Sequence, residues 1–169
     1  MWYVIQVMAC HESEMVSKCQ KVIKDGEEVF TMYTERMERR DGRWQPRRFV
    51  TFQKYIFVAT NDPDDFRIRL HSVSGLTKML GAGDDVIPIQ TEEEDFLRRI
   101  GGSDHIIGKS CVYSEGDKVK VVSGPLSGME GQIEWFDKRQ RLIGIKTMFL
   151  NQKTVIKLGA EFIRKEEEV

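Results

Sequence analysis

The 169-residue sequence predicts an α+β protein of two domains, an α/β sandwich followed by a small all-β barrel. Short β-type runs alternate with helical patterns over the first hundred residues, which is typical of a sheet covered by helices. Beyond residue 114 only short β-type runs remain, separated by glycine, proline and aspartate. Residues 101–114 have no sustained periodicity. We therefore expect the first domain at 1–102, a flexible linker at 103–114 and the barrel at 115–169.

The first domain opens with a strand and a helix. Residues 2–8 are rich in aromatic and β-branched side chains, as expected of a buried strand. Apolar residues from Met15 to Ile23 recur at helical spacing, and Asp25-Gly26 supplies a helix stop. Residues 29–34 then predict a second strand.

An arginine-rich segment follows, with Trp44 near its centre. Asp41-Gly42 in the middle of this segment is a turn signal. We expect the exposed arms of a hairpin or loop, with a wet and mobile tip, returning into a strand over 49–60. The six arginines are Arg36, Arg39, Arg40, Arg43, Arg47 and Arg48.

Two more helices are expected before the linker. Asp62-Pro63 provides an Asx cap and a proline at the first helical position, so a helix begins there. Residues 76–80 suit a short strand that ends at Gly81. Residues 91–94 read as a capping box opening a helix that stops at Gly101-Gly102.

The barrel is predicted from four β-type runs at residues 118–122, 132–136, 142–147 and 154–158. A turn containing Gly124-Pro125, Gly128 and Gly131 separates the first two. We interpret these glycines as structural, because they permit positive φ and close backbone approach.

Composition and motifs argue against several classes of protein. No apolar run is long enough to span a membrane and the N-terminus lacks the features of a signal peptide, so we expect a cytoplasmic protein. Cys10, Cys19 and Cys111 form no Cys-x-x-Cys pair, which indicates reduced thiols and no structural zinc. No nucleophile-elbow, P-loop or metalloprotease motif occurs, so we expect neither an enzyme nor a cofactor. Cys10 beside His11 is a weak catalytic candidate, since sequence neighbours rarely share the geometry that activates a thiol.

Charge is unevenly distributed along the chain. The formal net charge is −1, yet residues 109–165 hold eleven basic and six acidic residues, and an acidic run at 166–168 masks the excess. From residue 138 to residue 157 there are six basic residues and no acidic one. Such a surface attracts phosphate, although a merely solvated basic face is the competing interpretation.

Three segments resemble one known family. Residues 115–136, with Gly124-Pro-Leu-Ser-Gly-Met-Glu-Gly131, resemble the KOW motif of the NusG family of transcription elongation factors. Trp2-Tyr-Val-Ile-Gln-Val resembles the first strand of that family's NGN domain, and Tyr55-Ile-Phe-Val resembles its central strand. The match covers nearly the whole chain in the right order. The resemblance implies an NGN-like domain followed by an SH3-like KOW barrel.

The resemblance also implies a factor that stays bound to RNA polymerase during transcription. In the family an apolar patch of the N-terminal domain lies on the clamp helices and opposes pausing, while the barrel recruits another partner. By position, the polymerase-binding patch would include Tyr3, Phe52, Tyr55 and Leu80. For Phe52 and Tyr55, packing in the core is an equal alternative.

Two departures indicate a specialised member. The family's Phe-Pro-Gly-Tyr is here Phe52-Gln53-Lys54-Tyr55, so we expect that the turn is lost and the aromatics kept. Where housekeeping members carry Phe-Gly-Arg and a Thr-Pro pair, this chain continues from Phe149 with Leu-Asn-Gln-Lys-Thr-Val. We therefore infer a LoaP-like antiterminator, recruited through a hairpin in the nascent leader RNA.

The basic residues of the barrel are the candidates for binding that RNA hairpin. The arginine-rich segment could contact upstream or non-template DNA, with a solvated loop as the alternative. The general alternative is a NusG-type elongation factor whose barrel binds Rho or a ribosomal protein; a ribosome-associated protein is a further one. β-Branched runs and the glycines disfavour a helical form of the barrel, and we expect a monomer. The RNA-binding candidates are Lys118, Lys120, Lys138, Arg139, Arg141, Lys146, Lys153 and Lys157.

Overall fold

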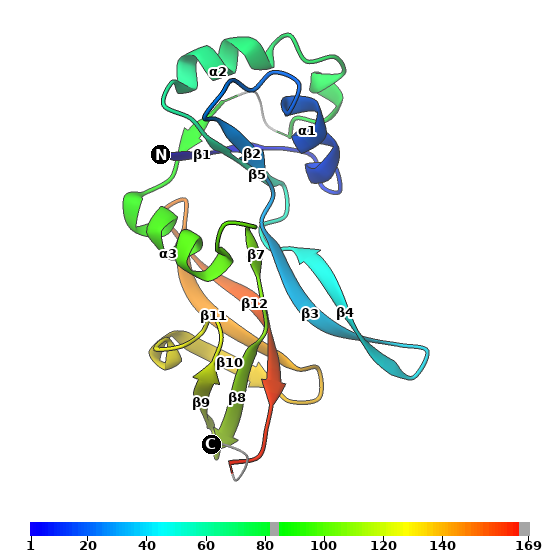
Figure 1. The fold of residues 1–169 in the computed structure, drawn as a ribbon, viewed down its shortest axis with the longest axis vertical. Helices are drawn as coiled ribbons and strands as arrows, with labels where there is room; N and C mark the ends of the chain where they lie inside the picture. Colours follow the sequence, from blue (N-terminus) through cyan, green and yellow to red (C-terminus); the bar gives the residue numbers. More distant parts are fainter. Residues whose placement is uncertain (82–84, 166–169) are drawn as a thin grey trace. The chain divides into compact units, whose positions relative to one another are not determined.

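The structure, a computed structural model, describes residues 1–81 and 85–165 and confirms the α+β class (Figure 1). The acidic run at 166–168 lies outside the described residues. The chain divides into two compact units: unit 1 is Met1–Met32 with Phe52–Asp95, and unit 2 is Tyr33–Thr51 with Phe96–Val169. No helix in the described part of the chain has the length and apolar character needed to cross a membrane.

Unit 1 is built on a four-stranded antiparallel sheet in the order β2-β5-β1-β6. The strands are β1 (Trp2–Gln6), β2 (Glu28–Phe30), β5 (Tyr55–Ala59) and β6 (Ile87–Pro88), and the helices are α1 (Glu12–Cys19) and α2 (Pro63–Leu70). One face of the sheet packs Ile5, Val7 and Ile56 against Met15 of α1 and Phe66 of α2. Burial of these side chains is the main favourable term in folding this unit.

The opposite face of this sheet carries buried aromatic rings. Trp2, Phe30 and Phe57 pack within 4.9–5.9 Å of one another, measured between ring centroids. Phe52 joins them, with its ring centroid 5.9 Å from that of Phe57. Side chains on both faces of β1 are therefore buried, in agreement with the buried strand predicted there.

Unit 2 contains a hairpin and a barrel sheet. The hairpin strands β3 (Tyr33–Arg40) and β4 (Arg43–Val50) pair with β7 (Ile106–Ile107) in the order β4-β3-β7. The five-stranded barrel sheet has the order β10-β11-β12-β8-β9. Its strands are β8 (Ser110–Glu115), β9 (Lys118–Ser123), β10 (Ile133–Asp137), β11 (Leu142–Phe149) and β12 (Gln152–Phe162). The four predicted β-type runs are confirmed as β9 to β12.

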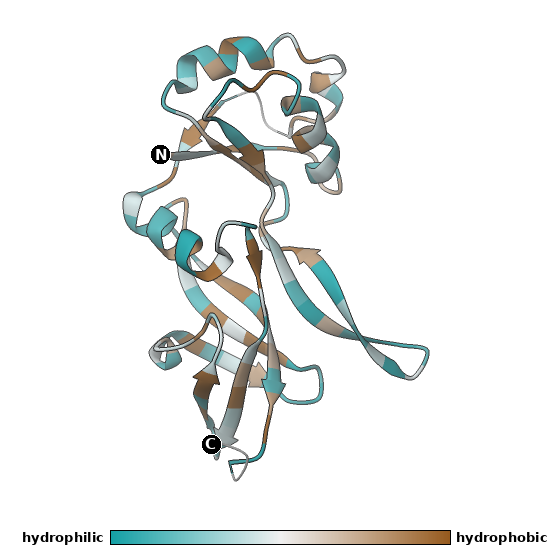
Figure 2. Cartoon of the chain, in the orientation of Figure 1, coloured by the Kyte–Doolittle hydropathy of each residue, from teal (hydrophilic) through white to brown (hydrophobic). Residues whose placement is uncertain are grey.

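The arginine-rich segment forms the predicted hairpin. Its two-residue turn is Asp41-Gly42, with φ of 52° and 76°, as a type I′ turn demands. The register pairs Arg40 with Arg43 and Arg39 with Trp44. Figure 2 shows that the outer part of this hairpin is mostly hydrophilic, whereas β7 is hydrophobic.

Two of the three helices begin where the sequence predicts. In α2 the Asp62 carboxylate accepts a hydrogen bond from the backbone N–H of Asp65 at 3.0 Å, confirming the Asx cap. Helix α3 (Thr91–Gly101) ends at the predicted Gly101. Helix α1, however, ends at Cys19 and not at Asp25-Gly26, because the chain turns at Gln20 and Lys21 with backbone hydrogen bonds of shorter span.

The predicted strand over residues 76–80 is wrong. Gly75, in the left-handed conformation with φ of 75°, opens a 3₁₀ helix at Leu76–Lys78. Leu76 and Met79 lie three residues apart and both are buried against the core of unit 1. Side chains at i and i+3 eclipse one another in a 3₁₀ turn, so this turn buries Leu76 and Met79 on the same side.

The turn between Phe52 and Tyr55 is retained, contrary to the sequence prediction. Lys54 adopts a left-handed φ of 70°, which glycine would adopt more easily. Its N–H donates to the buried Glu12 carboxylate at 2.9 Å, and its carbonyl accepts from the N–H of Val7 at 2.8 Å. These two hydrogen bonds hold a lysine in a conformation that its side chain disfavours.

The predicted linker at 103–114 contains regular structure. Strand β7 pairs in parallel with β3, and most of β8 also falls in this segment. The boundaries proposed from the sequence stay a prediction.

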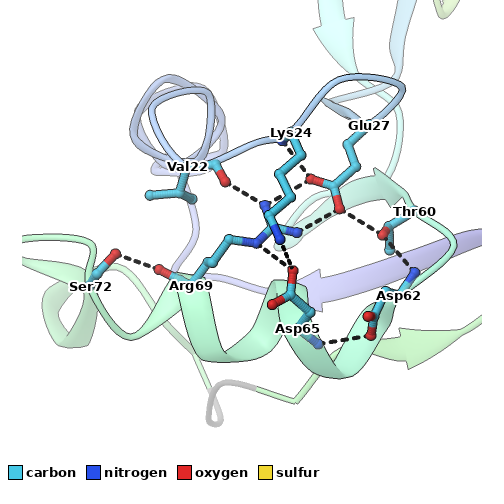
Figure 3. Close-up of polar contacts among 8 residues, drawn as sticks. All are labelled: Val22, Lys24, Glu27, Thr60, Asp62, Asp65, Arg69 and Ser72. Carbon is cyan, nitrogen blue, oxygen red and sulfur yellow. Dashed lines mark hydrogen bonds and ion pairs between the residues drawn. The ribbon is translucent and has the colours of Figure 1, made fainter.

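A partly buried ion-pair network joins α2 to the segment before β2 (Figure 3). The Arg69 guanidinium donates to the two Glu27 carboxylate oxygens at 2.6 and 2.8 Å, and its Nε donates to Asp65 at 2.9 Å. Thr60 Oγ1 also donates to Glu27 at 2.9 Å, and Lys24 Nζ donates to Asp65 at 2.7 Å. The Arg69 hydrogen bonds lower the pKa of Glu27 to about 2, although burial opposes this shift.

We predict that this network makes unit 1 sensitive to acid. Because the folded pKa of Glu27 lies below its ordinary value of 4.5, the unfolded chain binds more protons between these values. The stabilisation is full above pH 4.5 and disappears as the pH falls through about 2. Urea denaturation at several pH values should show a shallower acid loss for Glu27→Gln than for wild type. The exposed Asp25→Asn is the control, and equal slopes for Glu27→Gln and wild type would contradict the prediction.

The glycine-rich turn after β9 also has a steric reason. Gly124 has φ of 104°, and a Cβ there would lie 2.7 Å from the Cα of Ser110. Gly128 has φ of 77°, whereas Gly131 is outside the left-handed region and has open space around it. The structural interpretation therefore holds for Gly124 and Gly128, and not for Gly131.

We predict that Gly124→Ala destabilises the chain by about 1–3 kcal/mol, because it combines backbone strain with overpacking. The matched control is Gly131→Ala, which should change the free energy of unfolding by less than about 0.5 kcal/mol. Chemical denaturation of both variants measures the difference. Equal stabilities would refute the steric role of Gly124.

Candidate functional site

Three predicted RNA-binding lysines lie on one face of the β11–β12 pair. The register places Lys146 opposite Val155, Lys153 opposite Met148, and Lys157 opposite Gly144. Paired residues share a face and alternate residues point the same way, so the three lysines form one surface, here called the lysine face. The other face buries the barrel core, with Ile143, Ile145, Ile156 and Leu158.

The lysine face also carries apolar side chains. Met148 and Val155 are each 44% exposed between the lysines. Next to Lys157, the indole of Trp135 lies directly over Gly144, where a Cβ would be 2.3 Å from Trp135 Cε2. Cations beside an aromatic ring and small apolar groups are typical of surfaces that bind nucleic acid.

The other predicted cations are divided between two further places. Lys138, Arg139 and Arg141, here called the turn cations, lie in the β10–β11 turn, at the opposite end of β11 from the Leu150-Asn151 turn. Since a strand rises about 3.3 Å per residue, Arg141 lies about 23 Å along β11 from Met148, the partner of Lys153, but only about 10 Å from Gly144, the partner of Lys157. Lys118 and Lys120 lie on the edge strand β9. The structure thus brings together only part of the predicted set at any one place.

The three groups differ in their charged neighbours. Among the described residues the lysine face makes no ion pair, and neither do Lys138 and Arg139. Lys118 is paired across the strands with Glu115. The pKa of Glu115 is lowered first by a hydrogen bond from Lys165 and also by nearby positive charge, including that of Lys120. Phosphate would therefore compete with a carboxylate at β9, whereas the residues opposite the three lysines in β11 and β12 are all uncharged.

Two of the hairpin arginines lie over an aromatic ring. The Arg36 guanidinium lies 3.7 Å from the centroid of the Phe49 ring, and that of Arg47 lies at 5.1 Å. Burial, followed by the charge of Arg47, lowers the pKa of Arg36 against the opposing charge of Glu38. Arg47 also donates to the Glu38 carboxylate at 2.8 and 3.1 Å. The remaining hairpin arginines are exposed.

One turn cation reaches the hairpin. The Arg141 guanidinium lies 4.4 Å from the centroid of Trp44, and both residues belong to unit 2. The Arg141 contact is a cation–π interaction, worth about 0.5–2 kcal/mol. This contact holds Arg141 against the hairpin. Arg141 therefore differs from Lys138 and Arg139, which remain exposed.

The predicted polymerase-binding residues do not share one surface. Tyr3 pairs with Val58, on the face covered by α1 and α2, and Tyr55 pairs with Gln6, on the aromatic face. Both tyrosines are half-buried, whereas Phe52 is only 6% exposed. Leu80 is half-buried and forms an isolated β-bridge with Val7. The structure thus brings Phe52 and Tyr55 to one side of the sheet and places Tyr3 on the other.

The three cysteines form no disulfide within the described part of the chain. Burial raises the pKa of Cys19 to about 12, so its thiolate form is negligible at neutral pH. No group of three or more His, Cys, Asp or Glu side chains suited to a metal ion occurs in residues 1–81 and 85–165.

Sequence reasoning missed Trp135, Met148 and the contact between Trp44 and Arg141. The first two have no local signal, because their position on the lysine face depends on the register of β11 with its neighbours. Trp44 among arginines was visible in the sequence, but its partner lies 97 positions away.

Comparison with known proteins gives one consistent family. The sequence model of a family described as "Transcription termination factor nusG" matches residues 1–98. The chain is 21% identical to the "Transcription termination/antitermination protein NusG" of Thermus thermophilus, over 93% of this chain and 94% of that protein. It is 22% identical to the protein of the same name from Borreliella burgdorferi and to that from Pseudomonas aeruginosa, over 97% of each chain.

A solved structure is also similar. It is described as "Domain interaction in Thermotoga maritima NusG" and is 21% identical in sequence. The similarity covers 94% of this chain and 92% of the other, with a TM-score of 0.48.

Proposed function

The chain belongs to the NusG family of transcription factors, and we propose that it is a specialised antiterminator that travels with RNA polymerase. In this proposal the N-terminal domain holds the polymerase clamp helices and suppresses pausing, so hairpin terminators lose the time they need. The barrel binds structured RNA emerging from the polymerase. As a transcription factor the protein is not an enzyme, and its place is with the polymerase in the cytoplasm.

The lysine face is the observation that carries the RNA-binding part. It combines three lysines that make no ion pair in the described part of the chain with exposed Met148 and Val155. Lysine ammonium groups are on flexible stems and can therefore reach phosphates at different positions along an RNA stem. Double-stranded RNA is recognised mostly by its shape and not by its sequence. We therefore propose Lys146, Lys153 and Lys157 as the main contacts to the stem.

The other predicted cations have lesser roles in this proposal. Lys138 and Arg139 extend the positive surface at the far end of β11. Arg141 is engaged with Trp44, and Lys118 and Lys120 lie beside Glu115. These five residues add to the general attraction for RNA over a distance set by the salt concentration.

Half-buried aromatics support the polymerase-binding part. Tyr55 presents part of its ring at the start of β5, with Phe52 packed behind it against Phe57. We propose that Tyr55 contacts the clamp helices and that Phe52 positions it. Tyr3 and Leu80 would meet the polymerase on a second side of unit 1.

Two modest contacts in one chain reinforce each other. Once the first domain is on the polymerase, the barrel is held near the RNA exit at a high effective concentration. Neither contact then needs high affinity alone. The protein acts as a monomer in this scheme.

The RNA contact should depend strongly on salt. Replacing Lys146, Lys153 and Lys157 by glutamine should reduce the log–log slope of affinity against salt concentration by about 2–3, since each phosphate contact contributes about 1. Gel shifts with the leader RNAs of the source genome measure the slope. Lys21→Gln with Lys78→Gln, both exposed on unit 1, should leave it unchanged. A wild-type response that is flat in salt would remove the RNA claim.

Transcription through a terminator tests the whole proposal. With wild-type protein, read-through should require a leader hairpin placed upstream of the terminator. Read-through should fall severalfold in the triple glutamine variant, through lost RNA binding, and in Tyr55→Ala, which should still bind the RNA. Hairpin-independent activity, together with a barrel that binds Rho or a ribosomal protein and ignores RNA, would instead support a general elongation factor.

A further inference from the structure

A groove in unit 2 lies between the β3–β4 hairpin and the β10–β11 turn. Its volume is about 260 Å³. Drug-sized ligands occupy roughly 300–1,000 Å³, so this groove suits a smaller group such as one nucleobase. The side chains that matter here are Arg36, Arg39, Trp44, Phe49, Gln140 and Leu142.

The walls of the groove are planar. Phe49 and Trp44 reach the groove from opposite faces of the hairpin, and each stacks with a guanidinium, Arg36 at 3.7 Å and Arg141 at 4.4 Å. Trp44 lies opposite Arg39 across the hairpin, so a ring and a free guanidinium face the same side. Flat walls of this kind recognise unstacked bases, which stack on aromatic rings and on arginine planes.

The hairpin end of the groove is strongly positive. Arg39 lines the groove, and Arg40 and Arg43 follow at the hairpin tip; all three are exposed and make no ion pair within the described residues, whereas Arg48 lies opposite Glu35. The register sets Arg40 directly opposite Arg43. Like charges opposite each other destabilise a hairpin, and a bound anion between them removes this cost. The pair therefore points to a phosphate as its partner.

Acceptors in the groove favour RNA over DNA. Glu38, whose carboxylate is held by Arg47, lines the groove together with the Gln140 amide. A carboxylate can accept further hydrogen bonds beyond those from one arginine. The ribose 2′-hydroxyl, which DNA lacks, can donate a hydrogen bond to such a carboxylate. An ionised phosphate has no proton to donate to it.

We propose that this groove, here called the Trp44 groove, binds one base of a single-stranded RNA segment whose phosphates lie along the hairpin arginines. The proposal deepens the proposed function, on which it rests: the barrel binds the stem and the groove takes the unpaired nucleotides beside it. It assigns the hairpin arginines to RNA instead of the upstream or non-template DNA that the sequence suggested.

Oligonucleotide binding to the full chain tests this site. The probe is a fluorescein-labelled ten-nucleotide oligoadenylate RNA, with the DNA of the same sequence for comparison, read by fluorescence anisotropy. Trp44→Ala should weaken RNA binding about fivefold or more, because stacking of one base on an aromatic ring is worth about 1–3 kcal/mol. Trp44→Phe keeps a ring and should restore most of the affinity. Arg43→Gln at the exposed tip should weaken binding severalfold, while Arg67→Gln, on exposed α2, should not.

The outcomes separate this inference from the proposed function. Loss of hairpin RNA binding in the triple lysine variant, with oligoadenylate binding kept, would establish two sites. If no hairpin RNA bound to wild type but oligoadenylate still required Trp44, the proposed function would fail and the groove would stand. Equal affinity of Trp44→Ala and wild type, or tighter binding of DNA than of RNA, would overturn the groove proposal. Circular dichroism of Trp44→Ala establishes that the strands are intact.

Discussion

The register of β11 with β12 is the constraint on which the barrel surface depends. It places Ile143, Ile145, Ile156 and Leu158 inside, and by the same alternation it places the lysines outside. A slip of one residue would exchange the two sets, burying charge and exposing the core. The connection is a two-residue turn, Leu150-Asn151, with φ of 51° and 62°, which is the conformation that matches strand twist. The register therefore holds Leu150 in a left-handed conformation that residues other than glycine disfavour.

The charges of this chain divide into two kinds. Glu27, Arg69, Asp65 and Lys24 satisfy one another, and the two innermost side chains, Arg69 and Glu27, are 17% and 9% exposed. Removing one partner there would leave a poorly hydrated charge, so this network is structural. The lysine face and the exposed hairpin arginines face solvent instead, and they lose little on exchanging water for phosphate. At the lysine face no acidic residue lies opposite the three lysines in β11 and β12, which adds to what charge alone indicates.

Local signals predicted those elements whose causes are local. Asp41-Gly42 is sufficient for a type I′ hairpin, and Asp62-Pro63 is sufficient for a helix start, because each acts on its immediate neighbours. The turn at Lys54 could not be predicted, since its stability comes from Glu12, 42 positions away. Leu76 and Met79 were misassigned because short apolar runs fit a strand and a 3₁₀ turn equally well.

The candidate site was predictable in composition and not in arrangement. Six cations without an acid between residues 138 and 157 indicated a basic surface, and the structure distributes them between the β10–β11 turn and one face of the β11–β12 pair. Tyr3 and Tyr55 both have the residue type expected of a binding patch, but pairing across β1 and β5 puts them on opposite faces. These outcomes depend on how strands that are distant in the sequence pair with each other. A local stretch of sequence does not specify that pairing.

The two surfaces of unit 2 use different cations for a physical reason. Lysine is a compact, strongly hydrated point charge on a flexible stem, which suits phosphates at varied positions along a stem. Arginine is planar and stacks, which suits bases exposed on a single strand. The lysine face contains no arginine, and the hairpin contains no lysine. An RNA in which a stem adjoins unpaired nucleotides would present both kinds of group to this one unit.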